Sequence, residues 1–97
     1  LRRGSLTVAV STEGKSPLLA VAVRDRVGAL LGSHIGPTLD RLGEGRALVR
    51  ARFPDDPDQR RRCLEGLLTR RILRDLIQGK LDRFETHWET WKKSLLD

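Results

Sequence analysis

Residues 8–20 have the sequence VAVSTEGKSPLLA, which contains the change from strand to helix that decides how the chain is organised. Apolar and polar positions alternate over Ser5–Ser11, and several of these residues are β-branched, which predicts one strand. Ser16 and Pro17 then predict the start of a helix, because serine caps a helix N-terminus and proline suits the first helical position. A single strand is not stable alone. We therefore expect this strand either to join a sheet that this chain lacks or to pair with a partner chain.

The rest of the sequence predicts helices. Apolar residues recur at helical spacing, and Gly and Pro clusters separate the periodic segments. The fold class that follows is mainly α, with one N-terminal strand followed by about four helices. A kink near Thr69 is left open. The expected helices run from Pro17 to a cap at Gly32, from Thr38 to Phe53 after a loop over 32–37, from an Asp56 cap and Pro57 to Gly79, and from Leu81 to about Leu95.

The last of these helices has the cleanest apolar seam, with large residues three or four positions apart. We expect its tryptophans, Trp88 and Trp91, to pack in a core or a dimer interface and not to stack on a ligand. Cys63 falls on another apolar stripe and is expected to be an inert core thiol. The residues of the seam are Leu81, Phe84, Trp88, Trp91 and Leu95.

Composition narrows the function classes. The chain has 97 residues, 19 Lys and Arg against 13 Asp and Glu, and a net charge of +6. It contains no methionine and begins at Leu1, so we expect a fragment of a longer protein or a processed chain. One cysteine excludes an internal disulfide and a cysteine-based zinc site, and it favours a reducing, cytoplasmic setting. No apolar run is long enough for a membrane span. His34 and His87 lack ligand spacing, and we expect them at a surface or interface.

The segment between strand and helix carries the chemistry. Three hydroxyl side chains and the Lys15 ammonium converge on a helix N-terminus, which presents unpaired N–H groups to an anion. Gly14 allows a ligand to approach the backbone closely. Gly14-Lys15-Ser16 is like the end of a phosphate-binding P-loop, but Ala9 stands where that motif requires glycine, which disfavours ATP. An ordinary strand–turn–helix junction capped by serine remains open.

Residues 8–20, with Arg24-Asp25 beyond them, resemble the central segment of the precorrin-2 dehydrogenase / sirohydrochlorin ferrochelatase family, which includes the N-terminal module of sirohaem synthase. The resemblance is dense over Leu6–Leu31 and looser beyond it. Gln59–Arg62 resembles an arginine run that family members carry at a helix start. The helix with two tryptophans has no comparable counterpart.

The resemblance implies a place in tetrapyrrole biosynthesis. Family members have an N-terminal Rossmann domain that binds NAD, this central segment and a helical dimerisation region. They oxidise precorrin-2 to sirohydrochlorin with NAD, and some then insert ferrous iron as a substrate. For this chain the resemblance implies a central strand–loop–helix segment over 1–32, a helical dimerisation region over 33–97, and an upstream NAD domain that these residues do not include.

The resemblance also implies the site residues. Glu13 departs from the glycine frequent at its position, and Lys15 offsets its charge. A basic cleft would steer in a substrate with many carboxylates. The positions matched to the tetrapyrrole site are Ser11, Thr12, Gly14 and Ser16, and the residues expected to contact substrate carboxylates are Lys15 and Arg24.

No cofactor-binding residue is expected here, because the chain has no G-x-G-x-x-G after a strand. The resemblance implies that the catalytic aspartate lies in the Rossmann domain, and no histidine lies in a ligand-spaced cluster, so no catalytic or metal-binding residue is expected either. The resemblance and the apolar stripes imply a homodimer whose catalysis needs the NAD domain, and the single cysteine favours a cytoplasmic location. The alternative is a small basic helical nucleic-acid-binding domain, based on Arg60–Arg62 and the arginines at 70–74. Acidic residues lie among these arginines, which favours a solvated helix face with ion pairs to Asp58, Glu65 and Asp75 over phosphate binding.

Overall fold

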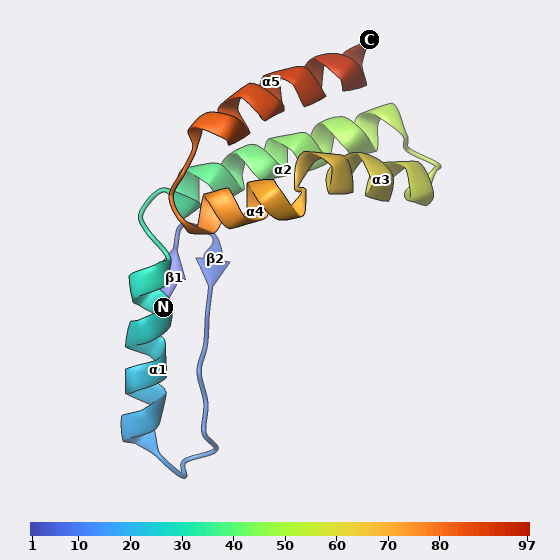
Figure 1. Cartoon of the computed structure of the whole chain (residues 1–97). Coiled ribbons are helices and arrows are strands. Elements are labelled where there is room, and N and C mark those ends of the chain that lie inside the picture. Colours follow the sequence, from blue (N-terminus) through green and yellow to red (C-terminus); the bar gives the residue numbers. More distant parts are fainter.

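The computed structural model describes all 97 residues. It confirms a mainly helical chain, in which a short β-hairpin precedes five helices (Figure 1). Residues 1–31 form a narrow projection, here called the arm, and residues 35–96 form a helical bundle, here called the body. The arm makes the molecule long, with principal extents of 53 × 30 × 20 Å. No helix combines the length and the apolar character that crossing a bilayer requires.

The arm begins with a hairpin and not with the single long strand expected over Ser5–Ser11. β1 (Arg2–Arg3) pairs antiparallel with β2 (Leu6–Thr7). Gly4 has a φ of +61°, which glycine adopts readily and which suits the first position of a two-residue turn. The expectation of a missing sheet or a partner chain for this strand was therefore wrong, because the strand pairs within its own chain.

After β2 the chain runs extended along the arm, turns at its tip and returns as α1 (Pro17–Leu30) (Figure 1). The predicted start of this helix is confirmed. Ser16 Oγ accepts a hydrogen bond from the backbone N–H of Leu19 at 3.1 Å, and proline occupies the first helical position. The serine cap and the proline together fix where the turn at the tip ends.

The other end of α1 is held by an arginine from the hairpin. The helix ends at Leu30, ahead of the predicted cap at Gly32. The Arg3 guanidinium donates to the carbonyl oxygen of Leu31 at 2.9 Å and to that of Gly28 at 3.2 Å. A cation at the carboxyl end of a helix satisfies carbonyls that have no partner inside the helix. Arg3 thus ties the base of α1 to the hairpin.

The arm meets the body where two glycines approach each other. α2 (Ile35–Arg52) begins ahead of the predicted Thr38, so the expected loop over 32–37 is shorter. Pro37 lies in the first turn of α2, where a proline is tolerated because the first N–H groups of a helix have no internal partner. A Cβ on Gly4 would lie 2.7 Å from the Gly36 Cα, so only glycine fits at this contact.

The predicted helix from Pro57 to Gly79 is in fact two helices, α3 (Pro57–Leu67) and α4 (Arg70–Ile77). Asp56 caps α3 as predicted, accepting a hydrogen bond at 3.1 Å from the backbone N–H three residues later. Thr69 starts α4, because its Oγ1 accepts a bond at 3.3 Å from the backbone N–H of Ile72. The kink left open near Thr69 is a full break, which makes five helices where about four were expected.

The apolar seam of the last helix, α5 (Asp82–Leu96), packs inside the body. The Trp91 indole N–H donates to the Cys63 carbonyl oxygen at 2.8 Å, and the rings of Trp88 and Trp91 stack with centroids 5.5 Å apart. The predicted packing of these aromatic residues is confirmed, in the core of this chain. Cys63, expected to be a core thiol, is half-buried. The buried cluster consists of Leu67, Ile72, Leu76, Phe84 and Trp88.

Candidate functional site

The candidate loop, residues 11–16, lies at the tip of the arm, where the extended segment turns into α1 (Figure 1). Glu13, Gly14 and Lys15 are exposed there. None of the five main hollows on the molecular surface is lined by loop residues. The loop residues therefore form an exposed surface and not a pocket, so they can contact a ligand from one side only.

The three hydroxyl side chains of the loop hold its backbone. Ser11 Oγ accepts a hydrogen bond from the Glu13 N–H at 3.1 Å, and Thr12 Oγ1 accepts one from the Ser16 N–H at 3.0 Å. Ser16 Oγ accepts the third, from Leu19. Each bond uses a lone pair of the hydroxyl oxygen, so each O–H hydrogen is left to donate. The loop can thus present up to three hydroxyl donors from a fixed backbone.

The backbone at the loop's centre is left-handed at two successive residues. Glu13 has a φ of +57° and Gly14 a φ of +78°. This region costs roughly 1–2 kcal/mol for a residue with a Cβ, which explains why glycine suits both positions. No atom lies within 4 Å of the point where a Gly14 Cβ would be, so the backbone there is open to a ligand.

The charges of the loop are not paired with each other. Neither Lys15 nor Glu13 takes part in an ion pair. The Lys15 ammonium therefore remains available to an anion, and the partial positive charge of the α1 N-terminus adds to it. The Glu13 carboxylate acts against an anion at the same place.

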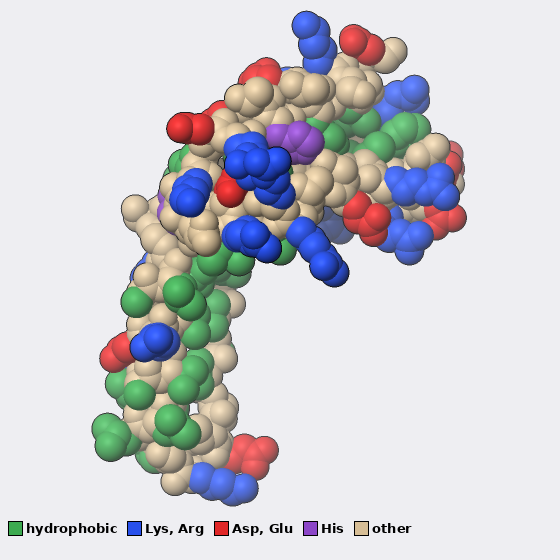
Figure 2. Space-filling model, viewed as in Figure 1, with side chains coloured by type: hydrophobic (Ala, Val, Ile, Leu, Met, Phe, Trp, Pro, Cys, Tyr) green, Lys and Arg blue, Asp and Glu red, His purple; other side chains and the backbone are tan.

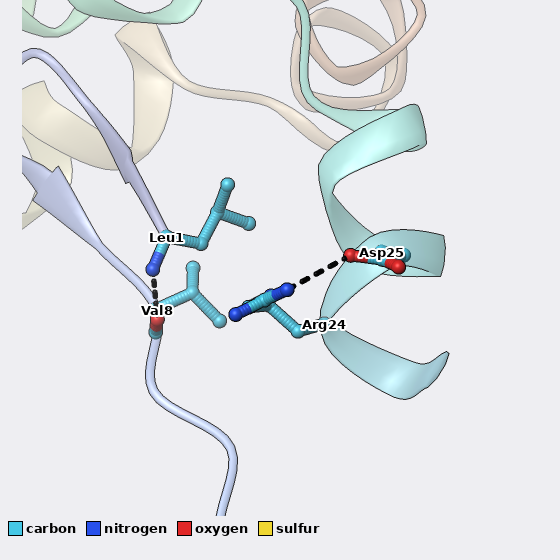
Figure 3. Close-up of polar contacts among 4 residues, drawn as sticks. All are labelled: Leu1, Val8, Arg24 and Asp25. Atoms are coloured by element: carbon cyan, nitrogen blue, oxygen red, sulfur yellow. Dashed lines mark hydrogen bonds and ion pairs between the residues drawn. The ribbon is translucent and has the colours of Figure 1, made fainter. Parts of the chain in front are cut away.

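Arg24 lies apart from the other predicted site residues. A helix rises about 1.5 Å per residue, which places Arg24 about 10 Å along α1 from Pro17. Figure 3 shows its side chain extending from α1 towards Val8, with the guanidinium bonded to Asp25. The Arg24–Asp25 distance is 3.3 Å and both side chains are more than half exposed. The structure thus brings together the five loop positions, Ser11, Thr12, Gly14, Lys15 and Ser16, and places Arg24 on the flank of the arm.

The histidines contact backbone carbonyls of their own chain. His34 Nε2 meets the Leu76 carbonyl oxygen, which links the junction of arm and body to the end of α4. His87 Nε2 lies 2.7 Å from the Gly66 carbonyl oxygen. No cluster of three His, Cys, Asp or Glu side chains has the arrangement of a metal site. Both histidines thus join segments within the chain.

Ion pairs form among the helical charges, as expected. Arg61 lies 3.6 Å from Asp58 and 3.9 Å from Glu65, one turn away in each direction. Asp75 was expected to pair with a neighbouring arginine, and it pairs instead with Arg83 of α5 at 3.2 Å. The sequence periodicity predicts partners on the same helix and has no information on contacts between helices.

Arg3 is the residue with a structural role that sequence reasoning missed. Its two bonds to the end of α1 orient the helix whose other end forms the loop. A signal was present in the sequence, since an arginine precedes the Gly4-Ser5 turn and the α1 carbonyls lack a terminal cation. The hairpin had to be recognised first, because only the hairpin brings Arg3 to the helix.

The arm matches a known protein family. Residues 3–30 match the family model described as "Sirohaem biosynthesis protein central", and this range includes all six predicted site positions. The match confirms the resemblance stated from the sequence and lies entirely within the arm.

Curated relatives match over both arm and body. The chain is 31% identical over 87 residues to the siroheme synthase of Pseudoalteromonas translucida, covering 90% of this chain and 18% of that protein. It is 42% identical over 66 residues to siroheme synthase 3 of Aeromonas hydrophila, covering 68% of this chain and 14% of that protein. The chain thus spans less than a fifth of the length of these relatives. No solved structure gives a significant match.

Proposed function

We propose that this chain, whose residues 3–30 match the family model "Sirohaem biosynthesis protein central", supplies the tetrapyrrole-binding loop and the subunit interface of an NAD-dependent precorrin-2 dehydrogenase. The observation that carries the proposal is the loop at the arm tip. It lies inside the matched residues, and its three hydroxyl oxygens all accept backbone N–H groups. The substrate class is an anionic tetrapyrrole, precorrin-2 or sirohydrochlorin.

The residues of the loop bind and orient the macrocycle. The hydroxyl hydrogens of Ser11, Thr12 and Ser16 donate to substrate carboxylates, and Lys15 adds an ammonium. A hydrogen bond to a charged group contributes about 1.5–3 kcal/mol, so a few such contacts outweigh the repulsion from the exposed Glu13 carboxylate. Arg24 contacts a carboxylate farther along the arm, in competition with Asp25.

The oxidation chemistry belongs to other parts of the protein. No G-x-G-x-x-G follows a strand here, so these residues do not fit NAD and no hydride step is assigned to them. We place NAD on the Rossmann domain of a longer chain, with ferrous iron as a further substrate if that protein also acts as a ferrochelatase. The resemblance implies a dimerisation region over 33–97, but α1 has no buried residue, so we place the subunit interface on the arm instead. The division into a central segment over 1–32 and a helical region over 33–97, and a cytoplasmic location, form part of this proposal.

A second subunit covers the arm. α1 has no buried residue, and its exposed apolar side chains include Leu18, at 83% exposure, and Leu30, at 60%. Figure 2 shows apolar side chains along the arm on the visible face. A helix that is apolar on several sides is stable when other protein covers it. We propose a homodimer in which the partner covers α1, and a second wall for the loop that comes from the partner or from the NAD domain.

A titration tests the loop assignment. Sirohydrochlorin or uroporphyrin is added to the protein, and the absorbance of the tetrapyrrole is followed. We expect the double variant Thr12→Ala/Lys15→Ala to bind at least about tenfold more weakly, because it loses two charge-assisted contacts. Thr12→Ser keeps the hydroxyl and should bind like wild type. The matched control Thr90→Ala/Lys93→Ala removes the same groups from exposed positions on α5. Equal binding by wild type and Thr12→Ala/Lys15→Ala would refute the assignment.

A further inference from the structure

Residues of α2 and α3 line a basic groove. These two helices meet at the end of the body away from the arm tip (Figure 1). The volume of the groove is about 540 Å³. Arg46 and Arg50 line it from α2, and Arg60 and Arg61 line it from α3. Figure 2 shows Lys and Arg side chains over the α3 end of the body, with acidic side chains between them. The groove shares no residue with the candidate loop.

The arginines of the groove differ in what they already bind. Arg61 is paired with Asp58 and Glu65, and Glu65 is the one acidic residue that lines the groove. Arg46 and Arg50 are exposed and take part in no ion pair. They are four residues apart, so they project from the same face of α2. The groove therefore holds two guanidinium groups on α2 that have no carboxylate partner within ion-pair distance.

Arg60 faces them from a fixed position. Its Nη1 donates to the carbonyl oxygens of Phe53 at 2.8 Å and Pro54 at 2.7 Å, in the turn that joins the two helices. A guanidinium has five N–H donors, so two bonds leave others free for a ligand. A preoriented guanidinium loses little freedom on binding an anion, which favours affinity. Three arginines thus line the groove, and each keeps guanidinium N–H donors that are free to bind a ligand.

The hydrophobic lining of the groove is Leu64 and Leu68. A lining that combines guanidinium groups with leucines suits a small molecule that has anionic groups and an apolar part. The volume suits a small molecule, and the paired acidic residues on α3 interrupt the continuous basic surface that a nucleic acid requires.

We propose that the groove between α2 and α3 is a second anion site, which binds a small molecule carrying two or more carboxylate or phosphate groups between Arg46 and Arg50 on one side and Arg60 on the other. The site goes beyond the proposed function and does not depend on it. Carboxylates and phosphates share the bidentate geometry that arginine recognises, so the test includes one probe of each kind.

Calorimetric titrations with citrate and with pyrophosphate, each at low and at moderate salt, test the site. We expect at least one probe to bind, and the stronger one identifies the ligand as carboxylate or phosphate. Arg46→Gln/Arg50→Gln should weaken that binding about tenfold or more, since charge-assisted bonds are lost. Both positions are exposed, so the melting temperature should stay unchanged and show that the variant folds.

The matched control is Arg70→Gln/Arg74→Gln. These arginines have the same spacing on α4, are exposed and form no ion pair, but they lie outside the groove. The control should change affinity by less than about twofold, because only general screening of charge is altered. The proposal is overturned if wild type binds neither probe, or if the control pair loses as much affinity as the groove pair.

Discussion

The arm and the body both contain many apolar residues and use them in opposite ways. All eleven buried residues of the chain lie in the body, and none lies in residues 1–31. Phe84 in the body is 1% exposed, whereas Leu18 in the arm is 83% exposed. The body therefore buries its own core, while the arm leaves its apolar side chains exposed. The loop at the arm tip is exposed in the same way and offers only one wall to a ligand.

Removal of a core aromatic ring gives the largest expected difference between the two regions. Phe84→Ala should lower the free energy of unfolding by about 3–5 kcal/mol, through lost burial and a cavity. Urea denaturation followed by circular dichroism measures this change. The matched arm variant Leu18→Ala should change the unfolding of the body by less than about 0.5 kcal/mol. Equal losses in the two variants would show that arm and body form one core.

Attachment of the arm should be the next most sensitive feature. Gly4→Ala requires a left-handed φ and brings a Cβ within 2.7 Å of the Gly36 backbone, so we expect a cost of about 2 kcal/mol or more. Amide exchange of the hairpin should speed up while that of α5 does not. Gly43→Ala is the control, since it meets no atom within 4 Å in an exposed helix interior and should stabilise by up to about 1 kcal/mol. Unchanged hairpin exchange in Gly4→Ala would contradict the contact.

Self-association should give the smallest of the three expected differences between arm and body variants, and this difference depends on protein concentration. Leu30→Lys places a charge on the face of the arm that we propose a second subunit covers, and it should weaken the dimer about tenfold. Leu96→Lys is the matched control, because Leu96 is 61% exposed and Leu30 60% exposed, but Leu96 lies at the end of α5. Light scattering over a dilution series measures both. An 11.0 kDa monomer for wild type at every concentration would contradict the dimer.

The sequence was sufficient to predict features that depend only on residues close together along the chain. Ser16 and Asp56 were expected to cap helices, and both do, because a cap needs only its own side chain and the N–H groups that follow. The positions of the loop were predicted for the same reason. The hairpin was missed, since its strands are two residues long and β1 consists of arginines, which give no alternating apolar pattern.

Features that depend on contacts between distant segments could not be predicted. Apolar spacing predicted a helix from Pro17 to a cap at Gly32, close to the observed α1, but carried no information on whether the body would cover it. The pairing of Asp75 with Arg83 and the bonds of Arg3 to α1 join different elements, so periodicity along one helix could not show them. The separation of Arg24 from the loop follows from the helical rise once the helix is known.

Hydrogen–deuterium exchange with and without uroporphyrin is the most direct test of a ligand site on the arm. It reports protection segment by segment, so it separates the loop and α1 from the groove between α2 and α3. We predict slower exchange over residues 11–24, with no change over the core segments of α4 and α5. Protection confined to the body, or none anywhere at saturating ligand, would contradict the assignment.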